Sequence, residues 1–250
     1  MKTDTPRPIR LKDYRPPSHL ITRVDLDVAL HPTETRVTSR LSITPNPAYG
    51  TADKLTLNGE DLELVSLKRD GKVVPEDAYL LSADTLTLLD VPNKPFKLEI
   101  VTQINPKANT ALQGLYLSNG IYCTQCEAEG FRRITYMLDR PDVLAVYTCR
   151  IEADVDEAPV LLSNGNPRER GTLDGGKRHY AIWKDPHPKP SYLFALVGGN
   201  LTSIASDFTT ASGDRVDLTI YVEPGREDRC GWAMDSLKRS MRWDEVRFGR

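Results

Sequence analysis

The stretch ITRVDLDVAL, residues 21–30, alternates apolar side chains with polar or charged ones. The apolar residues on one side of the alternation are Val24, Leu26, Val28 and Leu30. A period of two predicts a half-buried strand, because successive side chains of a strand point to opposite faces. The same period recurs in FKLEIVTQI, residues 96–104, and in RVDLTIYV, residues 215–222. The chain is therefore expected to consist mainly of strands.

Turn signals separate these strands at short intervals. They are residue pairs that favour tight turns, namely Asn58-Gly59, Asp70-Gly71, Asn119-Gly120, Asn164-Gly165 and Gly175-Gly176. Many short strands with such turns between them are typical of antiparallel sheets. We predict a mainly β fold, with antiparallel sheets in a saddle-shaped, sandwich-like arrangement.

The chain changes character near its end, where DRCGWAMDSLKRSMRWDEVRF, residues 228–248, shows helical periodicity. The apolar stripe consists of Ala233, Leu237 and Met241. Residues four positions apart lie on one face of a helix, so this segment predicts an amphipathic helix. A domain seldom ends on its first substantial helix. We therefore expect a β domain over residues 1–200 and, over residues 201–250, the start of a second domain that this chain truncates.

Composition and charge narrow the possible functions. Hydrophobic residues make up 39% of the 250 residues and charged residues 27%, as in ordinary globular proteins. The net charge of −2 gives no electrostatic reason to expect a nucleic acid or a membrane as partner. No apolar run is long enough to span a bilayer, and the first residues lack the apolar core of a signal peptide. Four cysteines make no disulfide framework in a chain of this length, so we expect a cytoplasmic protein.

One segment, CTQCEAEGFRRITYMLDRPDV at residues 123–143, concentrates residues that can carry chemistry. A structural zinc site would need four ligands, but Cys149 and Cys230 are single and distant, and the four histidines form no ligand pair. A redox pair would need a helix N-terminus, whereas the flanks of this Cys-x-x-Cys predict strand and the nearby glutamates would raise the thiol pKa. We therefore interpret its two cysteines as packing residues.

The acidic residues of this segment have two interpretations. In an extended segment Glu127 and Glu129 would point the same way, with Arg132 and Arg133 close behind them. An arbitrary Glu-x-Glu is usually part of an exposed ion-pair cluster. Here the apolar and aromatic flanks predict partial burial, and a buried carboxylate must meet a cation or hydrogen-bond donors. The segment is thus the best candidate for a recognition site, although composition alone leaves both interpretations open.

Longer stretches of the chain resemble a known family. NPKANTALQGLY at residues 105–116, followed by CTQCEAEGFRRITYMLDRPDVLAVYT at residues 123–148, is similar to the N-terminal domain of the bacterial aminopeptidase N family of zinc-dependent peptidases. The segments DPHPKPSYLFALVGGNL at residues 185–201 and WAMDSLKRSMRWDEVRFG at residues 232–249 continue the resemblance. It covers roughly residues 13–250.

The resemblance implies a β-rich saddle packed on a thermolysin-like catalytic domain, which carries a GxMEN substrate motif and an HExxH zinc motif. Neither motif occurs in this sequence. We therefore expect residues 201–250 to begin a catalytic domain that continues beyond residue 250. Zinc would be bound by the full-length enzyme and not by this fragment. The fragment alone should be inactive, and the missing catalytic domain of the same chain would be its partner.

The resemblance also implies the roles of individual residues. Glu127 would bind the free α-ammonium of a peptide substrate, Gln125 would lie along the same subsite, and no catalytic or metal-binding residue would belong to this chain. A fixed carboxylate can distinguish a charged N-terminus from an internal amide, because only the terminus offers an ammonium. Glu129 and Arg132 match the family pattern too, and we interpret them as a structural ion pair.

The leading hypothesis is therefore the N-terminal domain of a zinc-dependent metalloaminopeptidase that removes single residues from peptides with a free N-terminus. One alternative is a self-standing β-sandwich binding module without catalysis. Another is a Cys-x-x-Cys redox or zinc protein. The sequence leaves the preferred N-terminal residue of the substrate open.

Overall fold

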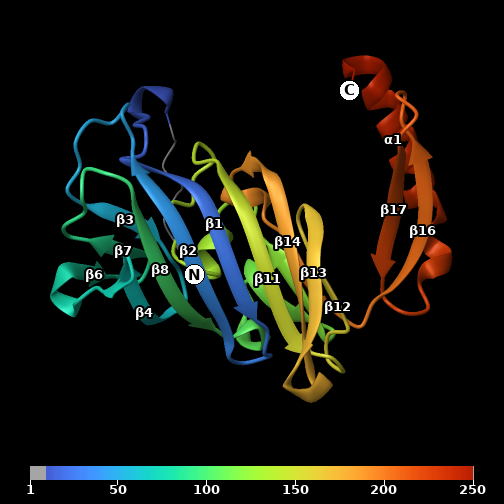
Figure 1. The fold of residues 1–250 in the computed structure, drawn as a ribbon, viewed down its shortest axis with the longest axis horizontal. Coiled ribbons are helices and arrows are strands. Elements are labelled where there is room, and N and C mark those ends of the chain that lie inside the picture. Colours follow the sequence, from blue (N-terminus) through green and yellow to red (C-terminus); the bar gives the residue numbers. More distant parts are fainter. Residues whose placement is uncertain (1–9, 250) are drawn as a thin grey trace.

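The computed structural model describes residues 10–249. Its largest feature is an eight-stranded sheet with the strand order β13-β14-β11-β1-β2-β8-β4-β5 (Figure 1). These strands are β1 (His19–Ala29), β2 (Thr35–Pro45), β4 (Glu63–Arg69), β5 (Lys72–Val73), β8 (Phe96–Ile104), β11 (Ala145–Asp154), β13 (Asn166–Leu173) and β14 (Arg178–Lys189). The mainly β prediction is thereby confirmed.

Three smaller sheets accompany the large one, with the orders β12-β15-β10-β9, β3-β7-β6 and β16-β17. Their strands are β3 (Leu55–Asn58), β6 (Tyr79–Leu81), β7 (Thr85–Leu88), β9 (Gly114–Ser118), β10 (Ile121–Gln125), β12 (Val160–Ser163), β15 (Leu196–Gly199), β16 (Thr202–Thr209) and β17 (Arg215–Val222). Short 3-10 helices occur at η1 (Leu11–Asp13), η2 (Glu76–Ala78), η3 (Pro106–Ala108), η4 (Phe131–Arg133), η5 (Asp174–Gly176), η6 (Ser191–Leu193) and η7 (Glu227–Arg229).

Strand β1 follows the alternation of its sequence. Val24, Leu26 and Val28 are buried, while the residues between them are only partly buried, so the predicted face is confirmed. The alternation of buried and exposed side chains is interrupted at the start of the strand, because the register with β2 shifts at Thr22. This β-bulge inserts one extra residue and turns Ile21 toward the core as well.

The pairing of β1 with β11 departs from a wholly antiparallel arrangement. The two strands run parallel, with Arg23 opposite Val146 and Ala29 opposite Glu152. Parallel neighbours cannot be joined by a tight turn, so a long stretch of chain must return to the same end of the sheet. The pairing therefore joins the strands before residue 105 to those after residue 144, and the segment between them carries the candidate site.

A single main core is shared by three of the sheets. Val24 of β1, Leu57 of β3 and Tyr122 of β10 all belong to it, and each is at most 1% exposed. Burial of apolar surface from several sheets in one core fixes their relative placement, because each sheet loses contacts if it shifts.

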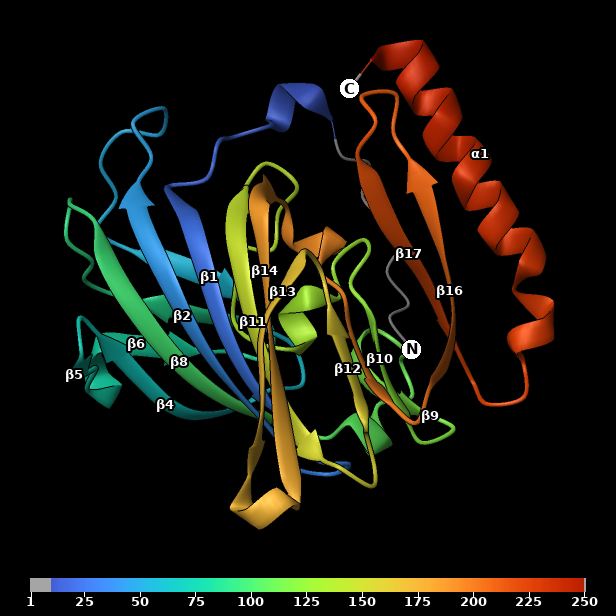
Figure 2. The same ribbon diagram turned by 45° about the vertical axis from the view of Figure 1, so that its right-hand side comes forward.

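The C-terminal helix α1 (Gly231–Phe248) packs on the β16-β17 hairpin, and Figures 1 and 2 show the two set apart at one end of the molecule. The predicted helix is confirmed, but the predicted stripe is wrong for Ala233 and Leu237, which are exposed. Met234 is the buried residue, in a small core with Phe208 and Leu218. A two-stranded sheet covers only a narrow face of the helix, and the packing rather than the periodicity selects that face.

Several large apolar side chains of α1 remain in solvent. They include Trp232, Trp243, Val246 and Phe248, each more than half exposed. No helix within residues 10–249 combines the length and the apolar character that crossing a membrane would need. Strand β16 begins at Thr202, and the division of the chain into two domains at residue 200 stays a prediction.

We expect Leu86→Ala to lower the free energy of unfolding by about 2–5 kcal/mol, because Leu86 in β7 is fully buried in the main core and its loss leaves a cavity. Leu80→Ala in the neighbouring strand β6 is the matched control, since Leu80 is 59% exposed and its loss should change stability by less than about 0.5 kcal/mol. Urea unfolding measures both. Equal losses would mean that this small sheet does not contribute to the core.

Candidate functional site

The Glu127 segment is a turn and not a strand, which corrects the extended conformation expected from the sequence. Strand β10 ends at Gln125, and Glu127–Gly130 form a turn before η4 begins. The Gly130 amide donates to the Cys126 carbonyl at 2.8 Å. A Cβ at Gly130 would lie 2.2 Å from the Gln125 carbonyl oxygen, so only glycine fits this closure. The Glu127–Ala128 peptide bond within the turn is cis.

The two cysteines beside the turn are packed side chains. Cys126 is 3% exposed, and burial, followed by the negative charge of Asp139, raises the pKa of its thiol to about 12. Burial, with a smaller effect of Glu223, also raises the pKa of Cys123. Reactive thiols have lowered pKa values, so both shifts run against redox chemistry. Among residues 10–249 no group of three or more His, Cys, Asp or Glu side chains could hold a metal ion.

Helix η4 is fixed to the core by an aromatic side chain. Phe131 is fully buried and makes edge-to-face contacts with Tyr147 at 6.1 Å and with Phe194 at 5.3 Å between ring centroids. Such contacts add to the burial of apolar area. The turn therefore leads directly into a helix whose first residue cannot move without disturbing β11 and the segment after η6.

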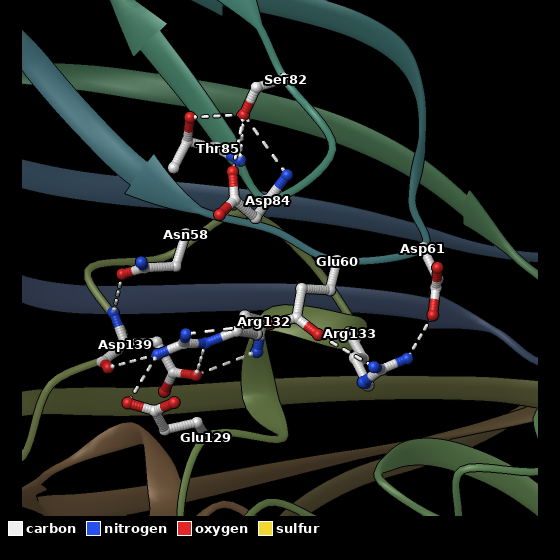
Figure 3. A network of polar contacts seen from close by, with 10 residues as sticks. All are labelled: Asn58, Glu60, Asp61, Ser82, Asp84, Thr85, Glu129, Arg132, Arg133 and Asp139. Carbon is white, nitrogen blue, oxygen red and sulfur yellow. Dashed lines mark hydrogen bonds and ion pairs between the residues drawn. The ribbon is translucent and has the colours of Figure 1, made fainter. Parts of the chain in front are cut away.

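Arg132 holds the other side of η4 through a buried carboxylate (Figure 3). Its Nε donates to Asp139 Oδ2 at 2.9 Å, and its backbone amide donates to the same oxygen at 3.2 Å. The side chains of Arg132 and Asp139 are 13% and 1% exposed. Arg132 Nη2 also lies 3.3 Å from Glu129, which confirms the expected structural ion pair of these two residues.

Arg133 pairs with acidic residues from a distant part of the chain. Its Nη2 lies 2.8 Å from Glu60, and its Nη1 donates to Asp61 (Figure 3). The Glu60 amide donates to the Arg132 carbonyl at 3.0 Å, so the loop after β3 is tied to η4 by backbone as well as side chains. Sequence reasoning missed Asp139, Glu60 and Asp61 as partners. The signal available was the arginine pair in an apolar frame, which required carboxylates from elsewhere.

Glu127 differs from the other carboxylates around the turn. Its side chain is exposed and accepts no hydrogen bond or ion pair from residues 10–249, whereas Glu129, Glu60 and Asp139 are all paired with arginines. The Gln125 side-chain amide donates to the backbone carbonyl of Glu127 at 3.2 Å, so the structure brings the two predicted site residues together. The turn thus presents one unpaired carboxylate beside others that are held in ion pairs.

Comparison with known proteins identifies the fold. The Peptidase M1 N-terminal domain model matches residues 16–193. The chain is 52% identical to Aminopeptidase N of Caulobacter vibrioides over its full 250 residues, and 48% identical to Aminopeptidase N of Escherichia coli over 248 residues. The alignment covers all of this chain in the first comparison and 99% of it in the second. The chain spans only 28% of the length of either relative.

Solved structures agree with these relatives. The crystal structure of Legionella pneumophila aminopeptidase A in complex with aspartic acid superposes with a TM-score of 0.92 at 38% identity, and covers 97% of this chain and 28% of that one. The M1 zinc metallopeptidase of Deinococcus radiodurans superposes with a TM-score of 0.76 over 93% of this chain and 54% of that one. At 15% identity the second likeness shows the fold alone.

We expect Cys126 to resist alkylation in the native protein. With a pKa of about 12, only about one thiol in 10⁴ is ionised at pH 8, and the side chain is also buried. Peptide mapping after brief iodoacetamide treatment would show Cys126 unmodified, while all four cysteines react in denaturant. Native labelling of Cys126 at the rate of a free thiol would restore the redox hypothesis.

Proposed function

The chain belongs to the M1 peptidase family, whose N-terminal domain it contains, and on this premise we propose that it works within a zinc-dependent aminopeptidase. The enzyme removes single residues from peptides that have a free N-terminus. The chain spans 28% of the length of its bacterial relatives, and residues 10–249 offer no group of metal ligands. Zinc and the residues that activate water therefore belong to the part of the protein outside this chain.

The contribution of this chain is a carboxylate that binds the substrate's α-ammonium, and that carboxylate is Glu127. The observation that carries the proposal is its isolation, because it is the exposed, unpaired anion among carboxylates that arginines already hold in ion pairs. An amine with a pKa of about 7.7–8.0 is largely protonated at neutral pH and pairs with such a group. An internal amide offers no charge, so the carboxylate selects chain ends.

Gln125 supports the same subsite. Its amide holds the carbonyl of Glu127, and it is exposed beside the turn, so it is free to contact a substrate bound there. The amino acid in the Legionella neighbour, aspartic acid, has the α-ammonium that this subsite would bind. The proposed function thus combines a recognition element on this chain with chemistry performed elsewhere in the full-length protein.

The isolated 250-residue chain should neither hydrolyse an aminoacyl-anilide nor retain zinc. A catalytic zinc needs three protein ligands and an open position, and residues 10–249 contain no group of three candidate ligands. Metal analysis after dialysis and an anilide assay test both statements, with the full-length protein as the positive control. One tightly held zinc per chain, or turnover by the pure chain, would contradict the proposal.

Glu127→Gln in the full-length protein should lower kcat/KM by at least ~10-fold, because loss of the charge removes at least about 1.4 kcal/mol of binding to the ammonium. The loss should appear in KM if the ion pair is equally strong in the ground and transition states. Glu129→Gln is the matched control on the same turn. Its ion pair with Arg132 involves a carboxylate that is 69% exposed, so kcat/KM should stay near the wild-type value. Wild-type kcat/KM in Glu127→Gln would refute the site.

A further inference from the structure

We propose that Asp139 is a positioning residue for the amine-binding turn, and that it acts on Glu127 through Arg132. The proposal rests on the proposed function of Glu127 and goes beyond it. Asp139 makes no hydrogen bond or ion pair with Glu127, but its contacts with Arg132, Ser191 and Asn58 hold the segments that support the turn.

Asp139 joins three separate segments, two through its carboxylate and one through its backbone amide. Its Oδ2 accepts from the backbone amide and the Nε of Arg132, and its Oδ1 accepts from the hydroxyl of Ser191 in η6. The Asp139 backbone amide donates to Asn58 Oδ1 at 3.3 Å, at the end of β3 (Figure 3). With a side chain that is only 1% exposed, Asp139 is a fixed reference that solvent does not screen.

The position of Glu127 depends on both ends of its turn. The first end is set by β10, where Gln125 pairs with Gly114 of β9. The second end is set by η4, where Arg132 follows the turn and is fixed by Asp139. A turn held at one end only would still present a carboxylate, but in a range of positions. An ion pair with a substrate ammonium requires placement to within about an ångström.

A charged group is required at position 139 for this task. The Arg132 guanidinium is 13% exposed, and its Nε and the backbone amide both donate to one oxygen. A neutral Asn could keep its oxygen on Arg132 and donate its amide N–H to the Ser191 hydroxyl, but it would remove the buried negative charge that faces the Arg132 guanidinium. Asp139→Asn therefore loosens η4 while it leaves Glu127 itself intact.

The test compares two ligands in the full-length protein, leucine hydroxamate and its des-amino analogue 4-methylpentanohydroxamic acid. The two ligands differ only in the α-ammonium. The dissociation constant of the des-amino analogue divided by that of leucine hydroxamate, both measured by calorimetry, therefore reports recognition of the amine. Glu127→Gln should lower this ratio by at least ~10-fold. Asp139→Asn should lower the ratio by about 3–10-fold. Arg132→Lys should lower it by the same factor, because lysine keeps the positive charge but lacks the planar guanidinium with its several fixed N–H donors. The double variant Asp139→Asn/Arg132→Lys should lower the ratio no more than either of its single variants does, because both act on the same interaction.

The matched control is Asp142→Asn. Asp142 lies in the same segment and pairs with Arg140 at 2.7 Å, but contacts neither the turn nor η4, so the ratio should stay at the wild-type value. An unchanged ratio in Glu127→Gln would overturn the proposed function itself. A lowered ratio in Glu127→Gln together with an unchanged one in Asp139→Asn would overturn only the positioning role. If Asp139→Asn does not fold, Arg132→Lys gives the same decision.

Discussion

Asp139 carries a carboxylate that is almost completely withdrawn from water, and such an anion has to be matched by donors from the surrounding protein. The match comes from Arg132 and Ser191, which belong to different parts of the chain. Removing one partner of a buried pair typically costs about 3–5 kcal/mol, because the other charge is left uncompensated. The segments that meet here are therefore held in one arrangement, and the turn that bears Glu127 is built on top of it.

The acidic residues around the turn divide into two groups with different consequences. Glu60 and Glu129 neutralise arginines and tie η4 to its surroundings, so their charge is used within the domain. Glu127 keeps its charge available and is exposed. The proposed recognition site needs both groups, since an unpaired carboxylate on a mobile loop would bind an ammonium with poor geometry. The fold thus places one unpaired carboxylate on a rigid base in which the other carboxylates are held in ion pairs.

Local periodicity predicted much of the fold, and tertiary contacts decided the rest. The strand at residues 21–30 and the helix at residues 228–248 were predictable because each repeats its own period over many residues. The face of α1 was not, because Met234 is selected by the narrow hairpin beneath it. The turn at Glu127 was missed because Gly130 closes it through a contact with a carbonyl five residues earlier, which no period reveals. The pairing of Arg133 with Glu60 joins residues 73 positions apart, beyond the reach of any local pattern.

The parallel pairing of β1 with β11 bears on the order in which the protein forms during synthesis. β1 emerges early and can pair with β2 on one side at once, but its other edge stays open until β11 has been made. The chain between them includes the whole Glu127 turn. Closing so large a loop has an entropic cost that only the completed sheet offsets. The proposed amine subsite is completed later still, because Ser191 and Phe194, which contact Asp139 and Phe131, follow β11 in the chain.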